Sequence, residues 1–241
     1  GRRPSRRGPI RGATRPGLRG TGGSARMAGV TPDYDPLARW FAPLERLCFG
    51  GAMQRARTRF HPRLAASRTI LCLGPGDGRA LPPLLGAAPA ARILAVEPSQ
   101  AMGQRLIERL TPTQRERVEW IARPWLEIEP ELGPVDAIVS DFFLDQFEGP
   151  ELERMVERSA RHLAAGGSWA VADFQLPEGG LARQHARLWL GLLYPAFGRL
   201  TGLSCRRLDP PAPSLRAAGL ERVATYRTRL GLLGADLWQR P

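Results

Sequence analysis

The sequence predicts an α/β protein with a doubly wound, largely parallel sheet covered by helices on both faces. Two observations support this. Short apolar runs alternate along the chain with segments of helical periodicity, an order typical of parallel strands joined by right-handed crossovers. The first apolar run, residues 69–73, also breaks directly into glycines at alternate positions. A chain of 241 residues with 43% hydrophobic content suits one such domain.

Seven segments have the length and composition of strands. The fourth of them is apolar enough to be buried on both faces, as parallel strands are. The expected strands are 69–73, 92–96, 118–121, 135–140, 168–173, 221–228 and 233–240.

Helices are expected between these strands. Asp35-Pro36 begins a helical lead-in over residues 27–68, which Pro43 should kink or restart. Ser99 caps a helix with apolar residues at helical spacing, and Pro82-Pro83 makes the preceding helix short or late to begin. A helix over 151–164 should stop at Ala165-Gly-Gly. A strongly apolar helix is expected over 181–203.

The net charge of the chain is +12, from 35 arginines and no lysine, and it is unevenly distributed. Residues 1–26 carry eight of these arginines and no acid, so residues 27–241 hold 27 arginines against 23 acids, or +4. The first 26 residues lack the apolar content to form a core and are expected to be a disordered Arg/Gly/Pro-rich tail. A basic arm for nucleic acid or acidic lipid is the alternative. Residues 27–241 form the predicted domain.

Other classes of protein are disfavoured by composition. Three distant cysteines without a C-x-x-C pair argue for a reducing, cytoplasmic compartment and against a metal site. The apolar run at 188–197 is about half the ~20 residues that a bilayer span requires, which leaves only peripheral membrane contact open. No specific nucleic-acid partner is expected, and the oligomeric state is left open.

The most informative motif is the turn after the first strand, with Gly74, Gly76 and Gly78, followed by Glu97 at the end of the second strand. Glycine suits a sharp turn where a ligand approaches bare backbone. A carboxylate at the end of the next strand is placed to bind two ribose hydroxyls. The G-x-G-x-G spacing favours S-adenosylmethionine over a dinucleotide. The structural alternatives are a simple tight turn and an acid that starts the turn at Pro98.

Five segments in this order and spacing resemble the class I S-adenosylmethionine-dependent methyltransferases, in particular the ubiquinone/menaquinone-biosynthesis-like small-molecule methyltransferases. The resemblance runs over nearly all of 31–240. The segments begin at Tyr34 (YDPLARW), Leu71 (LCLGPGDG), Ala95 (AVEPS), Val135 (VDAIVSDFF) and Leu163 (LAAGGS). It implies a Rossmann-like sheet of seven strands in which the last runs antiparallel.

The resemblance also implies roles for particular residues. The turn Gly74-Pro75-Gly76 with Gly78 would hold the methionine part of the cofactor, and Glu97 beside Pro98 would hold the ribose. Further positions fall at the ends of the third and fourth strands. Ala122 and Arg123 would flank the adenine, and Ser140 and Asp141 would face the methionine end and the acceptor.

Two positions depart from the family pattern. Many relatives have an acid two residues before the first glycine, where this chain has Cys72. Many also have an acid after the third strand, where this chain has Arg123. These departures would weaken cofactor binding or shift those contacts to the backbone.

The predicted function is methyl transfer from S-adenosylmethionine to a small, apolar or aromatic acceptor. Asp141 is the candidate catalytic residue and Asp173 the second; a strand-end acid is equally typical of a helix cap. His61 and His162 are interpreted as structural or exposed. His185 follows the fifth strand in a region that can reach the active site, and catalysis is its less favoured interpretation. The alternative function is a non-catalytic S-adenosylmethionine-binding regulator or assembly factor. The apolar segment from Leu181 to Leu203 is expected to roof the acceptor pocket, with simple packing on the sheet as the alternative.

Overall fold

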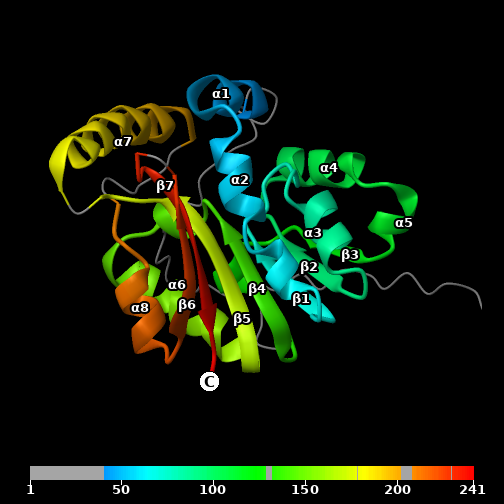
Figure 1. The fold of residues 1–241 in the computed structure, drawn as a ribbon. Helices are drawn as coiled ribbons and strands as arrows, with labels where there is room; N and C mark the ends of the chain where they lie inside the picture. Colours follow the sequence, from blue (N-terminus) through cyan, green and yellow to red (C-terminus); the bar gives the residue numbers. More distant parts are fainter. Residues whose placement is uncertain (1–40, 129–131, 178, 202–207, 229) are drawn as a thin grey trace, which may run out of the picture.

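The protein forms a seven-stranded sheet with the strand order β3-β2-β1-β4-β5-β7-β6 (Figure 1). The computed structural model describes residues 41–128, 132–177, 179–201, 208–228 and 230–241. β7 pairs antiparallel with both β5 and β6, and the other pairs are parallel, which confirms the expected sheet. The strands are β1 Thr69–Leu73, β2 Arg92–Val96, β3 Val118–Ile121, β4 Val135–Asp141, β5 Leu163–Phe174, β6 Glu221–Arg227 and β7 Leu233–Gln239.

Two helices begin where the sequence signals predicted, α4 at its cap and α3 at its proline pair. The Ser99 hydroxyl accepts a hydrogen bond from Met102 N (3.1 Å) and caps α4. The Pro82-Pro83 pair lies in the first turn of α3, where proline is tolerated. The helices are α1 Phe41–Phe49, α2 Ala52–Thr58, α3 Leu81–Ala87, α4 Gln100–Arg109, α5 Pro112–Arg115, α6 Gly149–His162, α7 Gly180–Thr201 and α8 Ala212–Ala217, with short 3₁₀ helices η2 His61–Leu64, η3 Trp125–Glu127 and η4 Leu144–Gln146.

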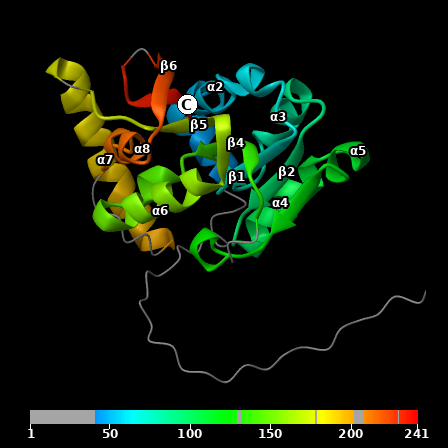
Figure 2. The same ribbon diagram turned by 90° about the horizontal axis from the view of Figure 1, so that it is seen from below.

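Each face of the sheet has its own apolar core, because successive strand residues point to opposite sides. Along β1, Ile70 and Cys72 pack in one core with residues of α2, α3, α4 and α7. Leu71 and Leu73 pack in the other core with residues of α6 and α8. Seen from below, α2 and α3 lie on one side of the sheet and α6 and α8 on the other (Figure 2). Because both faces of the sheet are buried, the sequences of the strands are continuous apolar runs.

One boundary prediction was wrong. β5 begins at Leu163 rather than at 168, and the predicted helix stop at Ala165-Gly-Gly is part of the strand. The physical reason is pairing: Gly166 N donates to Arg240 O and Arg240 N donates to Gly167 O, both at 2.9 Å. A Cβ on Gly167 would lie 2.8 Å from the Ala164 carbonyl oxygen, so glycine serves close backbone approach here.

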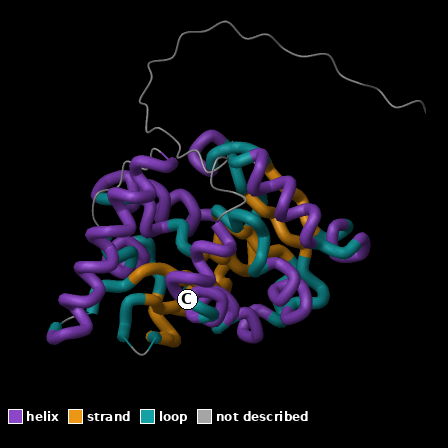
Figure 3. The backbone as a smooth tube through the Cα atoms, turned by 90° about the horizontal axis from the view of Figure 1, so that it is seen from above, coloured by secondary structure: helices purple, strands orange, loops and turns teal. Residues whose placement is uncertain are grey.

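The carboxyl ends of the parallel strands meet at one edge of the sheet, with α1 and α7 beside it (Figure 1). Seen from above, helices surround and partly cover this edge (Figure 3). The predicted helix start at Asp35-Pro36 and the tail 1–26 lie outside the described residues. Among the helices of the described residues, none is long and apolar enough to cross a membrane.

Candidate active site

The glycine turn leaves β1 with all three glycines in the left-handed region of backbone space. Their φ angles are +59° at Gly74, +57° at Gly76 and +72° at Gly78. A Cβ at Gly74 would lie 2.4 Å from the Phe143 ring, and one at Gly78 would lie 2.7 Å from Leu106. At Gly76 a Cβ would meet nothing within 4 Å. The outer glycines are therefore required by packing, while the middle one presents bare backbone to open space.

Glu97 follows β2 and joins the glycine turn directly. It is buried, with 5% of its surface exposed. One carboxylate oxygen accepts a hydrogen bond from Gly76 N (2.9 Å) and the other from Ser99 N (3.0 Å). Trp120 Nε1 donates to the Glu97 carbonyl oxygen (2.9 Å), which fixes the backbone of Glu97 itself. Each carboxylate oxygen can accept a second hydrogen bond, so the arrangement fits a pair of vicinal hydroxyls.

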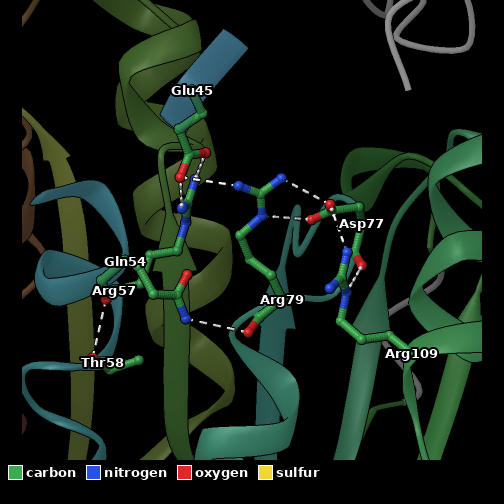
Figure 4. A network of polar contacts seen from close by, with 7 residues as sticks. All are labelled: Glu45, Gln54, Arg57, Thr58, Asp77, Arg79 and Arg109. Atoms are coloured by element: carbon green, nitrogen blue, oxygen red, sulfur yellow. Dashed lines mark hydrogen bonds and ion pairs between the residues drawn. The ribbon is translucent and has the colours of Figure 1, made fainter. Parts of the chain in front are cut away.

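A chain of ion pairs connects the turn to the helices at the N-terminal end of the described residues (Figure 4). Arg57 of α2 binds both carboxylate oxygens of Glu45 of α1, at 2.7 and 2.8 Å. Arg79, just past the turn, lies 3.0 Å from the same Glu45 and donates to both oxygens of Asp77. Arg109 of α4 also binds Asp77, at 3.0 Å. Planar guanidinium groups make such bidentate contacts with defined geometry.

The Asp77 carboxylate stays charged within this chain. Burial acts to raise its pKa, but the hydrogen bond from Arg79 and the charges of Arg79, Arg109 and Arg57 hold the pKa below its usual value. Burial acts to lower the pKa of Arg79, and its contacts with Asp77 and Glu45 raise it instead. The chain therefore fixes the turn to α1, α2 and α4 as a set of charged groups.

On the other side of the turn, β4 ends at Asp141 in a strained loop. Phe142 has φ +55°, the only non-glycine residue in the left-handed region among the described residues. Phe142 N donates to Ala172 O (2.6 Å) and Gln146 Nε2 donates to Phe142 O (2.7 Å), which hold the residue in place. The Arg57 guanidinium lies 4.8 Å from the centre of the Phe142 ring. Backbone strain of this kind concentrates at functional sites.

Three carboxyl groups gather at the ends of β4 and β5. The Asp141↔Ala172 register pair places Asp173 beside the end of β4, and Asp145 follows on η4. Burial raises the pKa of Asp141 and of Asp145 to about 7, against the lowering effect of the Arg57 charge. Burial also raises the pKa of Asp173, and the charges of Asp145 and Asp141 add to this, while the N–H groups of Phe143 and Asp145 oppose it. Interacting carboxyl groups of this kind titrate as a set and not one by one.

Aromatic rings continue from this loop toward α1 and α7. Phe142 contacts Phe174 at the end of β5, with ring centres 5.4 Å apart. Phe49 of α1 lies 5.7 Å from Phe174 and 5.9 Å from Trp189 of α7. His185, one turn before, lies 6.3 Å from Trp189. The rings extend in a row from β4 through β5 and α1 to α7 at the carboxyl edge of the sheet.

Not every predicted site residue lies in this arrangement. The Ser140 hydroxyl is fully buried and accepts a hydrogen bond from Trp169 Nε1 (2.9 Å). Ala122 and Arg123 are exposed after β3, and the Arg123 guanidinium binds the Glu127 carbonyl oxygen. His61 is buried, and burial lowers its pKa to about 4, in keeping with a structural role.

Sequence reasoning missed Arg57, Glu45 and Asp145. Asp145 had a signal, since it stands four residues after Asp141 in a short acidic spacing directly behind a strand. Arg57 and Glu45 had none, because one arginine among 35 does not stand out and their pairing depends on how α1 and α2 pack. The described residues contain no group of three His, Cys, Asp or Glu side chains that could hold a metal ion.

Comparisons with known proteins agree with this fold. Residues 70–167 match the family model described as a methyltransferase domain. A comparison with curated proteins finds no match.

Solved structures share the fold at low sequence identity. Mitomycin 7-O-methyltransferase MmcR aligns with a TM-score of 0.61 at 20% identity, over 87% of this chain and 61% of its own. The Burkholderia thailandensis 1,6-didemethyltoxoflavin-N1-methyltransferase, with bound 1,6-didemethyltoxoflavin and S-adenosylhomocysteine, has a TM-score of 0.60 at 18% identity, over 85% of this chain and 84% of its own. Human N-acetylserotonin methyltransferase, in complex with SAM, has a TM-score of 0.60 at 15% identity, over 84% and 55%. The chain thus spans less than two thirds of the first and third of these proteins, and none singles out the quinone-biosynthesis-like subfamily.

Proposed function

We propose that this chain is a class I S-adenosylmethionine-dependent methyltransferase that transfers a methyl group to a small aromatic acceptor. The observation that carries the proposal is the contact between the Glu97 carboxylate and Gly76 N (2.9 Å), which brings the turn and the strand-end acid into one site. Bound S-adenosylmethionine supplies the methyl group and an activated sulfonium leaving group. The protein's contribution is then mainly positioning, which in favourable cases supplies ~7–11 kcal/mol.

The cofactor assignment rests on two features of this chain. The φ of +57° at Gly76, with open space beside it, fits a ligand lying against bare backbone. The Glu97 carboxylate, held from below by Gly76 and Ser99, fits the ribose 2′- and 3′-hydroxyls. The neighbouring structures that contain S-adenosylmethionine or S-adenosylhomocysteine support the same assignment by fold. Gly74, Pro75, Gly78 and Pro98 would complete the binding surface.

The acceptor side favours an aromatic molecule. The row of rings from Phe142 to Trp189 offers edge and face contacts that are worth ~0.5–1.5 kcal/mol each beyond area burial. α7 leaves the end of β5 and brings Trp189 into this row. Leu188 of the same helix is 65% exposed, so α7 also keeps an apolar side chain unburied. This supports α7 as the roof of the acceptor site.

Asp141 is the candidate proton acceptor. Its pKa of about 7 matches a general base that works near neutral pH, and, taken as whole residues, Asp145 and Asp173 are more deeply buried than Asp141. Elevated carboxyl pKa values cost stability, and they are typical of active sites. The raised carboxyl pKa values therefore favour a catalytic role, because binding a cofactor without turnover requires no proton acceptor.

The test is transfer of isotope-labelled methyl from S-adenosylmethionine to a panel of small aromatic alcohols and amines, read by mass spectrometry. Label in an aromatic product is expected, and Glu97→Ala should abolish it at limiting cofactor. Label found only in protein or nucleic acid would contradict the small-molecule assignment. Absence of any transfer, together with intact cofactor binding, would support the non-catalytic alternative.

A further inference from the structure

Arg57 lies between the cofactor turn and the acceptor-side carboxyl groups. Its side chain is 7% exposed and both terminal nitrogens are bound to Glu45. Glu45 in turn pairs with Arg79, directly after the glycine turn. The guanidinium also lies over the ring of Phe142, the strained residue next to Asp141. A single buried cation therefore contacts groups that belong to both halves of the site.

The charged and titratable groups near Asp141 come from four elements, α2, η4, β5 and β1. Arg57 of α2 favours its charged form, and Asp145 of η4 experiences the same cation. Asp173 of β5 and Cys72 of β1 lie close enough that the Asp141 charge raises the pKa of each, after burial as the larger cause. Arg57 is thus the one cation that acts on Asp141 within the described residues, against neighbours that are acidic or neutral.

We propose that Arg57, from its place over Phe142, is a positioning residue that keeps Asp141 able to take a proton from the acceptor and links the loop after β4 to the cofactor turn. The proposal rests on the function proposed above and narrows the substrate class to acceptors that must lose a proton, namely aromatic hydroxyls or N–H groups. Asp141 accepts that proton while the methyl group replaces it on the oxygen or nitrogen and the sulfur keeps the electron pair of the broken C–S bond. The proton held by Asp141 is released to solvent before the next turnover.

The geometry explains why an arginine is needed. A lysine ammonium cannot bind both Glu45 oxygens and stack on a ring at the same time, whereas a guanidinium does both. Glu45 balances the charge of Arg57 without removing it, so the buried cation is tolerated next to an apolar loop. When α1 and α2 pack onto the turn through Arg79, they also place Arg57 over the ring of Phe142, the residue after Asp141. The proton-accepting side is therefore linked to the cofactor side through α1 and α2.

The experiment is a pH titration of the aspartate carboxyl carbons by ¹³C NMR on the full chain, with the Asp141 signal assigned by its loss in Asp141→Asn. Arg57→Gln should raise the titration midpoint of Asp141 by about one pH unit or more, as loss of a nearby opposite charge does. Arg109→Gln is the matched control, because it removes another arginine of the same ion-pair chain and should leave the midpoint in place. An unchanged or lower midpoint in folded Arg57→Gln would overturn the proposal.

A second variant covers the case in which Arg57→Gln does not fold. Glu45→Gln keeps the Arg57 charge but removes its balancing carboxylate, so the Asp141 midpoint should fall; a rise or no change would overturn the proposal. With an acceptor in hand, the pH profile of kcat should move in the same directions. Because the NMR readout needs no turnover, a missing methyl-transfer activity would count against the proposed function and not against the Arg57–Asp141 link.

Discussion

The two halves of the candidate site are built differently. The cofactor half consists of residues close in sequence at the ends of two adjacent strands, the glycine turn after β1 and Glu97 after β2. The acceptor half collects Arg57, Asp141 and Asp173 from α2, β4 and β5, more than a hundred residues apart at its extremes. A local turn carries its geometry in its own sequence, since only glycine suits its φ angles. A site assembled from distant elements has no such local signature.

The largest expected effect falls on the acceptor half. Asp141→Asn removes the proposed proton acceptor while keeping the shape of the side chain. General-base removal lowers rates by about 10²–10⁴-fold, so kcat should fall by that order with the cofactor Kd unchanged. A quenched time course with the labelled cofactor would measure the fall in kcat. Equal losses in kcat and in cofactor affinity would show that the two halves are not separable.

The same residue should make stability depend on pH. The folded pKa of Asp141 is raised from 3.8 to about 7, so the folded state holds a proton that the unfolded state releases between about pH 4 and 7. The stability of the wild type should therefore fall as pH rises through this window, at about 1.4 kcal/mol per pKa unit in the limit. Asp141→Asn lacks this loss and should melt several degrees above the wild type at pH 8, with the gap narrowing at pH 4. The same difference in melting temperature between Asp141→Asn and the wild type at pH 4 and at pH 8 would contradict the raised pKa.

On the cofactor half, the test is a pair of glycine substitutions. Gly74→Ala places a Cβ in a left-handed conformation and 2.4 Å from the Phe143 ring, so it should cost about 1–3 kcal/mol of stability and weaken cofactor binding. Gly86→Ala in α3 is the control, because its Cβ meets nothing within 4 Å and helix propensity predicts a gain of up to about 1 kcal/mol. Urea unfolding compares the two. Similar behaviour of both variants would show that the turn does not require its first glycine.

This difference between the halves also explains what the sequence alone could predict. Strand positions and the Ser99 cap follow from patterns within a few residues, and the glycine turn and Glu97 each stand directly after a predicted strand. The start of β5 at Leu163 was missed because the Gly166-Gly167 pair also suits a helix end, and only its pairing with Arg240 decides between them. Arg57 and Glu45 could not be found, since their contact depends on the packing of α1 against α2. The pKa of Asp145 is raised by burial, and that of Asp173 by burial together with the charges of Asp145 and Asp141, none of which a local sequence pattern reports.

The most direct measurement is isothermal titration of S-adenosylhomocysteine into the wild type, Glu97→Ala and Asp141→Asn, with NAD as a competing ligand. The wild type should bind S-adenosylhomocysteine and not NAD. Glu97→Ala should lose about ten- to a hundredfold in affinity, or ~1.5–3 kcal/mol, because a charged acceptor of two hydroxyl hydrogen bonds is removed, while Asp141→Asn should bind like the wild type. Binding of NAD, or equal affinity in folded Glu97→Ala and the wild type, would contradict the assignment of the glycine turn and Glu97 as an S-adenosylmethionine site.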